Sequence, residues 1–158
     1  MDLSVKPMEA IVPLIRLQLE NGGRSHLVVT GISMHPTLRH GRDRVELIPP
    51  PEKLERGDLI LYRRDNGRYI LHRIVSKPCN GSFTCSGDNQ WQPETVQADQ
   101  VIALVDTYIR GKKRIPVKSW YCRLYVQLVV LFFPVRRPFL FIRRAFGRLR
   151  KCLRKKSR

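Results

Sequence analysis

Six short apolar segments, each ended by a turn, constrain the fold of this chain more than any other feature. They lie between residues 26 and 109 and are rich in Val, Ile, Leu and Tyr. Gly, Pro, Asp and Asn cluster between them, as in Asp65-Asn66-Gly67 and Asn80-Gly81, and such clusters favour tight hairpin turns. Many short strands joined by tight turns predict a mainly β fold with a curled antiparallel sheet. The expected strands are 26–32, 45–48, 59–62, 69–75, 82–85 and 101–109.

Charge and periodicity divide the chain into three expected parts. Apolar residues recur at helical spacing from Met8 to Leu19 and stop at Asn21-Gly22-Gly23, where glycine can end a helix. From Arg110 onward the sequence holds 17 of the 30 Lys and Arg residues and no acid. We therefore expect a short amphipathic helix in 1–25, a β core in 26–109 and a basic amphipathic helical tail in 110–158.

The expected tail has the pattern of a membrane-surface helix. Beyond Pro138, apolar residues recur on one helical face and cationic residues on the other, which suits an anionic membrane surface. The apolar stretch 126–135 is too short to cross a bilayer, and residues 1–20 are too charged for a secretion signal or a spanning helix. We expect peripheral or tail-anchored membrane association, and the positive charge favours the cytoplasmic face. The expected membrane-binding residues are Phe139, Ile142, Arg143, Arg144, Phe146, Arg148 and Leu149.

Three polar residues in separate segments could together perform acyl transfer. Ser33 follows an apolar segment and precedes Pro36, so a rigid turn would expose its hydroxyl. A serine hydroxyl is a weak nucleophile without a base, and His72 can serve as one near neutral pH. Asp88 follows Gly87 in a turn, where an ionised carboxylate could orient the imidazole.

Each of these residues also has a simpler interpretation. A lone strand histidine is more often a core or surface residue with satisfied hydrogen bonds, and Gly-Asp-Asn alone more often closes a hairpin. The order serine, histidine, aspartate shifts the balance towards catalysis. Glu94 is the alternative acid and Asp99 a weaker one, while His35 is a weaker candidate for the base.

Taken together, these segments resemble the catalytic boxes of the signal peptidase I family of membrane-associated serine endopeptidases. The similarity runs from about residue 28 to 105, roughly half the chain. Bacterial leader peptidases of that family carry a lysine base where this chain has His72, so the resemblance is to the serine-histidine branch, typified by the catalytic subunit of the endoplasmic-reticulum and archaeal enzymes. The matching boxes are Ser33-Met34-His35-Pro36-Thr37-Leu38, Arg56-Gly57-Asp58-Leu59-Ile60-Leu61-Tyr62, the segment 69–75 and Ser86-Gly87-Asp88-Asn89.

The resemblance implies a serine endopeptidase that cleaves a leader or signal segment from an extended peptide, with small residues before the scissile bond. Ser33 would be the nucleophile, His72 the general base and Asp88 the orienting acid. The backbone N–H of Ser33 would donate to the oxyanion. The family's second donor is a serine hydroxyl two residues earlier, where this chain has Gly31. Thr30 or a main-chain amide is expected to donate instead, and Gly31 would ease close approach of the substrate backbone. No cofactor or metal is implied, and the four cysteines lack a zinc-binding spacing.

Two other functions fit parts of the sequence. A self-cleaving transcriptional repressor is disfavoured, because such proteins use a lysine base and the nearest downstream lysine is Lys77. A catalytically degenerate adaptor, which binds a membrane or nucleic acid through its basic tail, stays open as the alternative. The many Phe residues of that tail favour a lipid partner over a nucleic acid.

Overall fold

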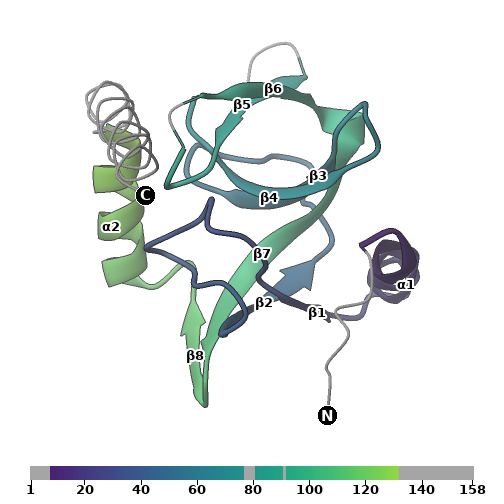
Figure 1. Cartoon of the computed structure of the whole chain (residues 1–158), viewed down its shortest axis with the longest axis horizontal. Coiled ribbons are helices and arrows are strands. Elements are labelled where there is room, and N and C mark those ends of the chain that lie inside the picture. Colours follow the sequence, from purple (N-terminus) through teal and green to yellow (C-terminus); the bar gives the residue numbers. More distant parts are fainter. Residues whose placement is uncertain (1–7, 77–80, 91, 132–158) are drawn as a thin grey trace, which may run out of the picture.

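The computed structural model describes residues 8–76, 81–90 and 92–131. They form an eight-stranded antiparallel sheet with a helix at each of two opposite sides (Figure 1). The strands pair in the order β1-β2-β7-β3-β4-β5-β6, and β8 pairs with β7; β1 and β6 end the path, so the sheet is open. The strands are β1 (Ser25–Val28), β2 (Asp43–Ile48), β3 (Leu59–Arg63), β4 (Tyr69–Ile74), β5 (Ser82–Ser86), β6 (Glu94–Gln97), β7 (Val101–Arg110) and β8 (Lys113–Pro116), and the helices are α1 (Met8–Glu20), α2 (Trp120–Leu131) and a 3-10 turn, η1 (Ala98–Gln100).

The mainly β, antiparallel fold with a helix at its start confirms the coarse expectation from the sequence. Helix α1 ends one residue before Asn21, and Gly22 follows with a left-handed φ of 72°. Each of the six expected segments contributes a strand, although β1 ends at Val28, so the expected strand 26–32 is too long. Strands β6 and β8 were not expected, and β8 lies within the segment that we assigned to the basic tail.

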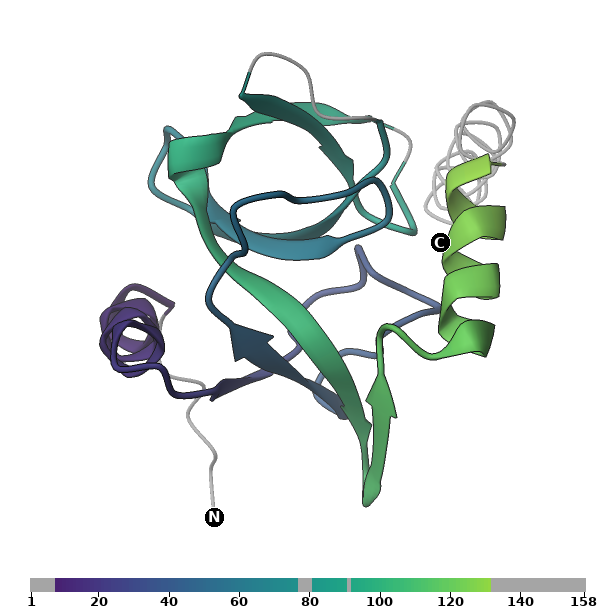
Figure 2. The same ribbon diagram turned by 180° about the vertical axis from the view of Figure 1, so that it is seen from behind.

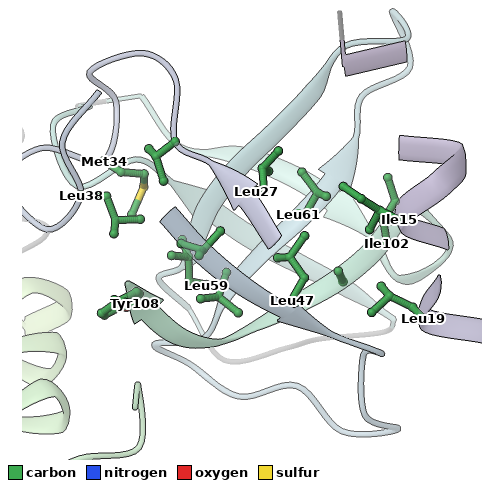
Figure 3. Close-up of a cluster of buried hydrophobic side chains, with 14 of the residues drawn as sticks. Ile15, Leu19, Leu27, Met34, Leu38, Leu47, Leu59, Leu61, Ile102 and Tyr108 are labelled. Carbon is green, nitrogen blue, oxygen red and sulfur yellow. The ribbon is translucent and has the colours of Figure 1, made fainter. Parts of the chain in front are cut away.

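Two hydrophobic clusters cover the two faces of the sheet. Alternate residues of β3 divide between them, with Leu59 and Leu61 in one cluster and Ile60 and Tyr62 in the other. Figure 3 shows Ile15 and Leu19 of α1 at one end of the first cluster and Met34 and Leu38 at its other end. Met34 and Leu38 are 2 % and 0 % exposed, so the turn that begins with Ser33 is anchored in the core on its inner side.

Helix α2 packs against the turn that precedes β3. A Cβ added to Gly57 would lie 2.7 Å from Cγ1 of Val126, so the helix approaches this backbone closely. Nη2 of Arg56 donates to the carbonyl oxygen of Val130 at 3.1 Å. Cys122 and Val130 are buried on the same side of the helix. The described part of the segment beyond Arg110 therefore begins with a strand and a packed helix.

The described residues do not include the expected membrane-binding helix. In the part of the chain that the structure describes, no helix is both long enough and apolar enough to cross a membrane. The residues that we expected to bind the membrane lie outside the described residues, namely Phe139, Ile142, Arg143, Arg144, Phe146, Arg148 and Leu149.

Candidate active site

Ser33 and His72 converge on the backbone of Gly87. A Cβ added to Gly87 would lie 3.0 Å from Cβ of Ser33 and 3.1 Å from Nε2 of His72. Two atoms that both lie that close to one point are about 6 Å apart at most, so the Ser33 side chain and Nε2 of His72 are close neighbours. The fold thus brings together the nucleophile and the base that the sequence suggested.

The turn after β5 holds the Ser33 segment in place. The backbone N–H of Asn89 donates to the carbonyl oxygen of Ser33 at 2.7 Å, and Nδ2 of Asn89 donates to the carbonyl oxygen of Ile32 at 3.2 Å. The Cβ position of Gly87 is also only 2.7 Å from the carbonyl oxygen of Ser33, which leaves no room for a side chain. Gly87 is therefore a site residue in its own right, and its place directly before Asp88 was the sequence feature that could have identified it.

Strand pairing fixes the position of His72. The residue lies on β4, pairs with Ile60 of β3 and is 1 % exposed. Its Nδ1 lies 3.0 Å from Oε1 of Glu94 and 3.1 Å from the hydroxyl of Tyr62. The Tyr62 hydroxyl also donates to Oε1 of Glu94. An ionised carboxylate at Nδ1 favours a proton on that nitrogen and leaves the lone pair on Nε2, the nitrogen next to Gly87.

The surroundings of Glu94 keep its carboxylate ionised. Burial would raise its pKa, but hydrogen bonds from His72, Arg64 and Tyr62 outweigh burial and lower the pKa of Glu94 to about 2. Arg64 contributes two of these bonds, from Nε at 2.5 Å and from Nη2 at 2.8 Å. Burial and the nearby Glu94 carboxylate raise the pKa of Tyr62, so its phenol keeps its proton. Sequence reasoning did not identify Tyr62 and Arg64, since each lies in or beside a strand whose pattern indicates packing.

Asp88 forms a buried ion pair with Arg73. Nε and Nη2 of Arg73 each lie 2.9 Å from an oxygen of the Asp88 carboxylate, and both side chains are at most 1 % exposed. The Thr37 hydroxyl also donates to this carboxylate, and Nη1 of Arg73 donates to the carbonyl oxygen of Gly57 at 2.9 Å. The burial of Arg73 would lower its pKa, but the Asp88 carboxylate raises that pKa and keeps the guanidinium charged. From the sequence we expected Asp88 at the imidazole, whereas the acid found at Nδ1 is Glu94.

The backbone before Ser33 is also constrained. Gly31 has a left-handed φ of 82°, and its N–H donates to Nδ1 of His40 at 2.8 Å. The N–H of Gly31, which we considered as an oxyanion donor, is thus bonded to a side chain. His40 gains a local structural role that the sequence did not indicate. His35, the weaker candidate for the base, is exposed.

A cavity of about 100 Å³ lies beside Ser33. Strands β1, β3 and β4 and the start of α1 contribute its walls. Most of the lining side chains are aliphatic, polar atoms also face the cavity, and its size suits a small side chain. The lining residues are Met8, Leu27, Val28, Val29, Thr30, Ser33, Met34, Leu61, Tyr69, Ile70 and Leu71.

The described residues contain no group of three or more His, Cys, Asp or Glu side chains that could hold a metal ion. Cys85 and Cys122 are buried free thiols, and burial raises the pKa of Cys85 to about 12, so this thiol is a poor nucleophile. Comparison with protein-family models and with curated proteins finds no match to this sequence.

Proposed function

We propose that this protein is a serine endopeptidase in which Ser33 is the nucleophile and His72 is the general base. The observation that carries the proposal is the approach of Ser33 and Nε2 of His72 to one point at Gly87 while Glu94 holds Nδ1. A nucleophile, a base facing it and an acid behind the base are the components that acyl transfer needs.

The chemistry follows from this arrangement. As Oγ of Ser33 attacks the peptide carbonyl carbon, Nε2 of His72 accepts the hydroxyl proton, and the carbonyl oxygen becomes an oxyanion that the N–H of Ser33 stabilises. The imidazolium then gives this proton to the leaving amine, which produces an acyl-enzyme on Ser33. Water then attacks the ester carbonyl carbon with His72 again as base. The imidazolium returns the proton to Oγ of Ser33 as the ester bond breaks, which releases the new carboxyl end of the peptide and restores the serine.

We assign the orienting role to Glu94 and a bracing role to Asp88. Glu94 carries a carboxylate at Nδ1 that stays ionised at neutral pH, so it can stabilise the imidazolium. The Asp88 carboxylate is engaged by the Arg73 guanidinium in a fully buried pair. Through this pair Asp88 holds the turn that carries Gly87 and Asn89 against the Ser33 segment.

The surroundings of Ser33 suit an extended peptide. Strand β1, which leads towards Ser33, is one end of the strand path, and an edge strand can pair with a peptide main chain. The small cavity beside Ser33 suits a short side chain next to the scissile bond. The resemblance described above adds the substrate class, a leader or signal segment that is removed from a precursor.

Mass spectrometry of peptide cleavage tests this proposal. Purified protein would be incubated with anionic vesicles and a panel of leader-like peptides, beside Ser33→Ala and His72→Ala. Cleavage at one site by the wild type, lost in both variants and kept by the controls Ser82→Ala and His26→Gln, is the expected result. Unaltered turnover by Ser33→Ala would refute the assignment. A wild type that is folded and cleaves no peptide would favour the catalytically degenerate adaptor.

A further inference from the structure

Helix α2 carries a broad apolar face that the described fold leaves uncovered. Six of its twelve residues are apolar or aromatic and between 36 % and 77 % exposed. With 3.6 residues per turn, these six positions fall within an arc of about 140° around the helix axis. The outer face of α2, as we call it, consists of Trp120, Tyr121, Leu124, Tyr125, Leu128 and Leu131.

The packing of α2 prevents this face from turning inward. Cys122 and Val130 on the opposite side are 8 % and 4 % exposed, and Val126 contacts Gly57. In Figures 1 and 2, α2 lies at the edge of the molecule opposite α1. A helix that is apolar on nearly all sides normally buries all of them, and exposed patches of this kind mark binding surfaces.

The charge around α2 indicates the kind of partner. From Arg110 to the last residue, the sequence contains 17 cationic residues and no acid. Within the described part these include the exposed Lys112 and Lys113 where β7 turns into β8, Lys118 just before α2, and Arg123 within α2. The chain continues from Leu131 with 11 more Lys and Arg residues interspersed with apolar residues. A partner that matches both properties is apolar and anionic.

We propose that the outer face of α2 is a membrane-docking surface for an anionic lipid bilayer. A lipid surface offers acyl chains to the three leucines and negative headgroups to the cations. Trp and Tyr side chains prefer the level of the headgroups, where an apolar ring and a polar edge are both satisfied. A second copy of this chain, or its own continuation beyond Leu131, would bring further positive charge to the same surface. The exposed apolar side chains occupy one face of α2, which suits a helix that lies in the plane of such an interface.

This surface would place the active site next to the lipid, a consequence that rests on the proposed function. The Tyr125 hydroxyl, at one edge of the outer face, lies 3.0 Å from the hydroxyl of Thr37. Thr37 belongs to the turn that begins with Ser33 and donates to Asp88. A precursor held in the same membrane would then meet Ser33 without leaving the bilayer surface.

Fluorescence of Trp120 tests the docking directly. The chain has two tryptophans, so Trp91→Phe leaves Trp120 as the single emitter. The full-length protein would be mixed with vesicles of phosphatidylcholine alone or with added phosphatidylglycerol. We expect a blue shift of Trp120 emission, and quenching by brominated acyl chains, in the anionic vesicles. The double variant Leu124→Ser/Leu131→Ser should bind these vesicles at least about tenfold more weakly, since each leucine loses burial in the interface.

Two equally exposed leucines on α1 supply the matched control. Leu14 and Leu17 are 65 % and 58 % exposed, against 51 % and 64 % for Leu124 and Leu131. The variant Leu14→Ser/Leu17→Ser should bind as the wild type does, and circular dichroism should show both variants folded. Vesicle binding with unquenched Trp120 would overturn the proposal, because the remainder of the basic segment would then act alone. The proposal would also be overturned if the protein did not bind the vesicles. The same holds if Trp120 emission shifted with protein concentration in the absence of lipid, or if it shifted only when RNA was added. Loss of lipid binding with peptide cleavage intact would leave the proposed function standing.

Discussion

The carboxylate of Glu94 lies 3.0 Å from Nδ1 of His72, and the opposite nitrogen of the same imidazole, Nε2, approaches Gly87 beside Ser33. The contact determines which nitrogen carries the proton, and hence which one can accept the proton of a serine hydroxyl. Asp88, nearby in sequence, instead pairs with Arg73 in the interior. We therefore expect the two acids to have separable effects, Glu94 on turnover and Asp88 on folding.

Replacing Glu94 should reduce turnover with little effect on substrate binding. In Glu94→Gln the uncharged amide no longer stabilises the imidazolium and can donate to Nδ1, which favours the wrong tautomer. The analogous change in a serine protease lowers kcat by about 10⁴-fold, and we expect a loss of roughly 10²- to 10⁴-fold here with KM nearly unchanged. Steady-state kinetics on a cleaved peptide measures both constants, with the exposed Asp99→Asn as control. An unchanged kcat would remove Glu94 from the mechanism.

Replacing Asp88 should destabilise the fold. Asp88→Asn leaves the fully buried guanidinium of Arg73 without its counter-charge, and breaking one partner of a buried pair costs about 3–5 kcal/mol. Urea unfolding followed by circular dichroism measures this free energy. The double variant Arg73→Met/Asp88→Asn removes the stranded charge and should recover part of the loss. Asp88→Asn with wild-type stability would show that the pair does not hold the turn.

A methyl group at Gly87 should separate the base from the nucleophile. The Cβ of Gly87→Ala would meet the Ser33 carbonyl oxygen at 2.7 Å and Nε2 of His72 at 3.1 Å, so the turn or the imidazole must move. We expect kcat to fall at least about tenfold, because acyl transfer tolerates little misplacement. Gly111→Ala is the control, since Gly111 has a left-handed φ of 61° but open space around it. Equal activity of the two variants would contradict the close approach.

The Tyr125 hydroxyl should help to position the turn that begins with Ser33. Tyr125→Phe removes its 3.0 Å contact with the Thr37 hydroxyl, and a lost hydrogen bond of this kind lowers the free energy of unfolding by about 1 kcal/mol. We expect kcat to fall a few-fold with KM unchanged, since the turn that begins with Ser33 loses a restraint. Tyr121→Phe, on the exposed side of α2, should change neither quantity. Similar behaviour of both variants would exclude this positioning role.

Acid should destabilise the protein partly through Glu94. Its pKa falls from the usual 4.5 to about 2 on folding, so its contribution to stability is complete above pH 4.5 and disappears as the pH falls through 2. Between these values the unfolded chain binds a proton at Glu94 that the folded chain does not, and acidification favours unfolding. Urea unfolding across this range should show a shallower loss of stability for Glu94→Gln than for the wild type. Parallel curves would place the acid sensitivity in other groups.

The sequence predicted the elements of this fold better than their pairing. In a strand over 69–75, alternation puts Ile70, His72 and Ile74 on one face, and the two isoleucines do pack in one cluster with Tyr62. Strand β6 carries one buried apolar residue, Val96, so its pattern was too weak to identify. Strand β8 is basic and ends in Pro116, and only its pairing with β7 makes it a strand. In both cases tertiary contacts decided what local pattern could not.

The same limit explains the position of the acids. Asp88 was the preferred candidate because its box follows the serine and histidine boxes along the chain. Glu94 comes to His72 only because β6 folds back on β5, with Glu94 opposite Cys85, and β5 pairs with β4. The order of the motifs along the chain does not show that β6 folds back beside β5. Two acids only six residues apart, Asp88 in the turn after β5 and Glu94 at the start of β6, can thus have completely different surroundings.

His72 and Arg73 are consecutive residues of β4, so their side chains leave opposite faces of the strand. His72 is the proposed base, and Arg73 forms the ion pair that braces the turn after β5. The hairpin between β3 and β4, closed by the N–H of Arg64 on the carbonyl oxygen of Arg68 at 2.9 Å, sets which residue faces which way. If β4 paired with β3 one residue out of register, His72 and Arg73 would exchange faces of the sheet. Surface loops usually tolerate added residues. An added residue in this hairpin loop, however, would change which side chains of β4 face the candidate active site.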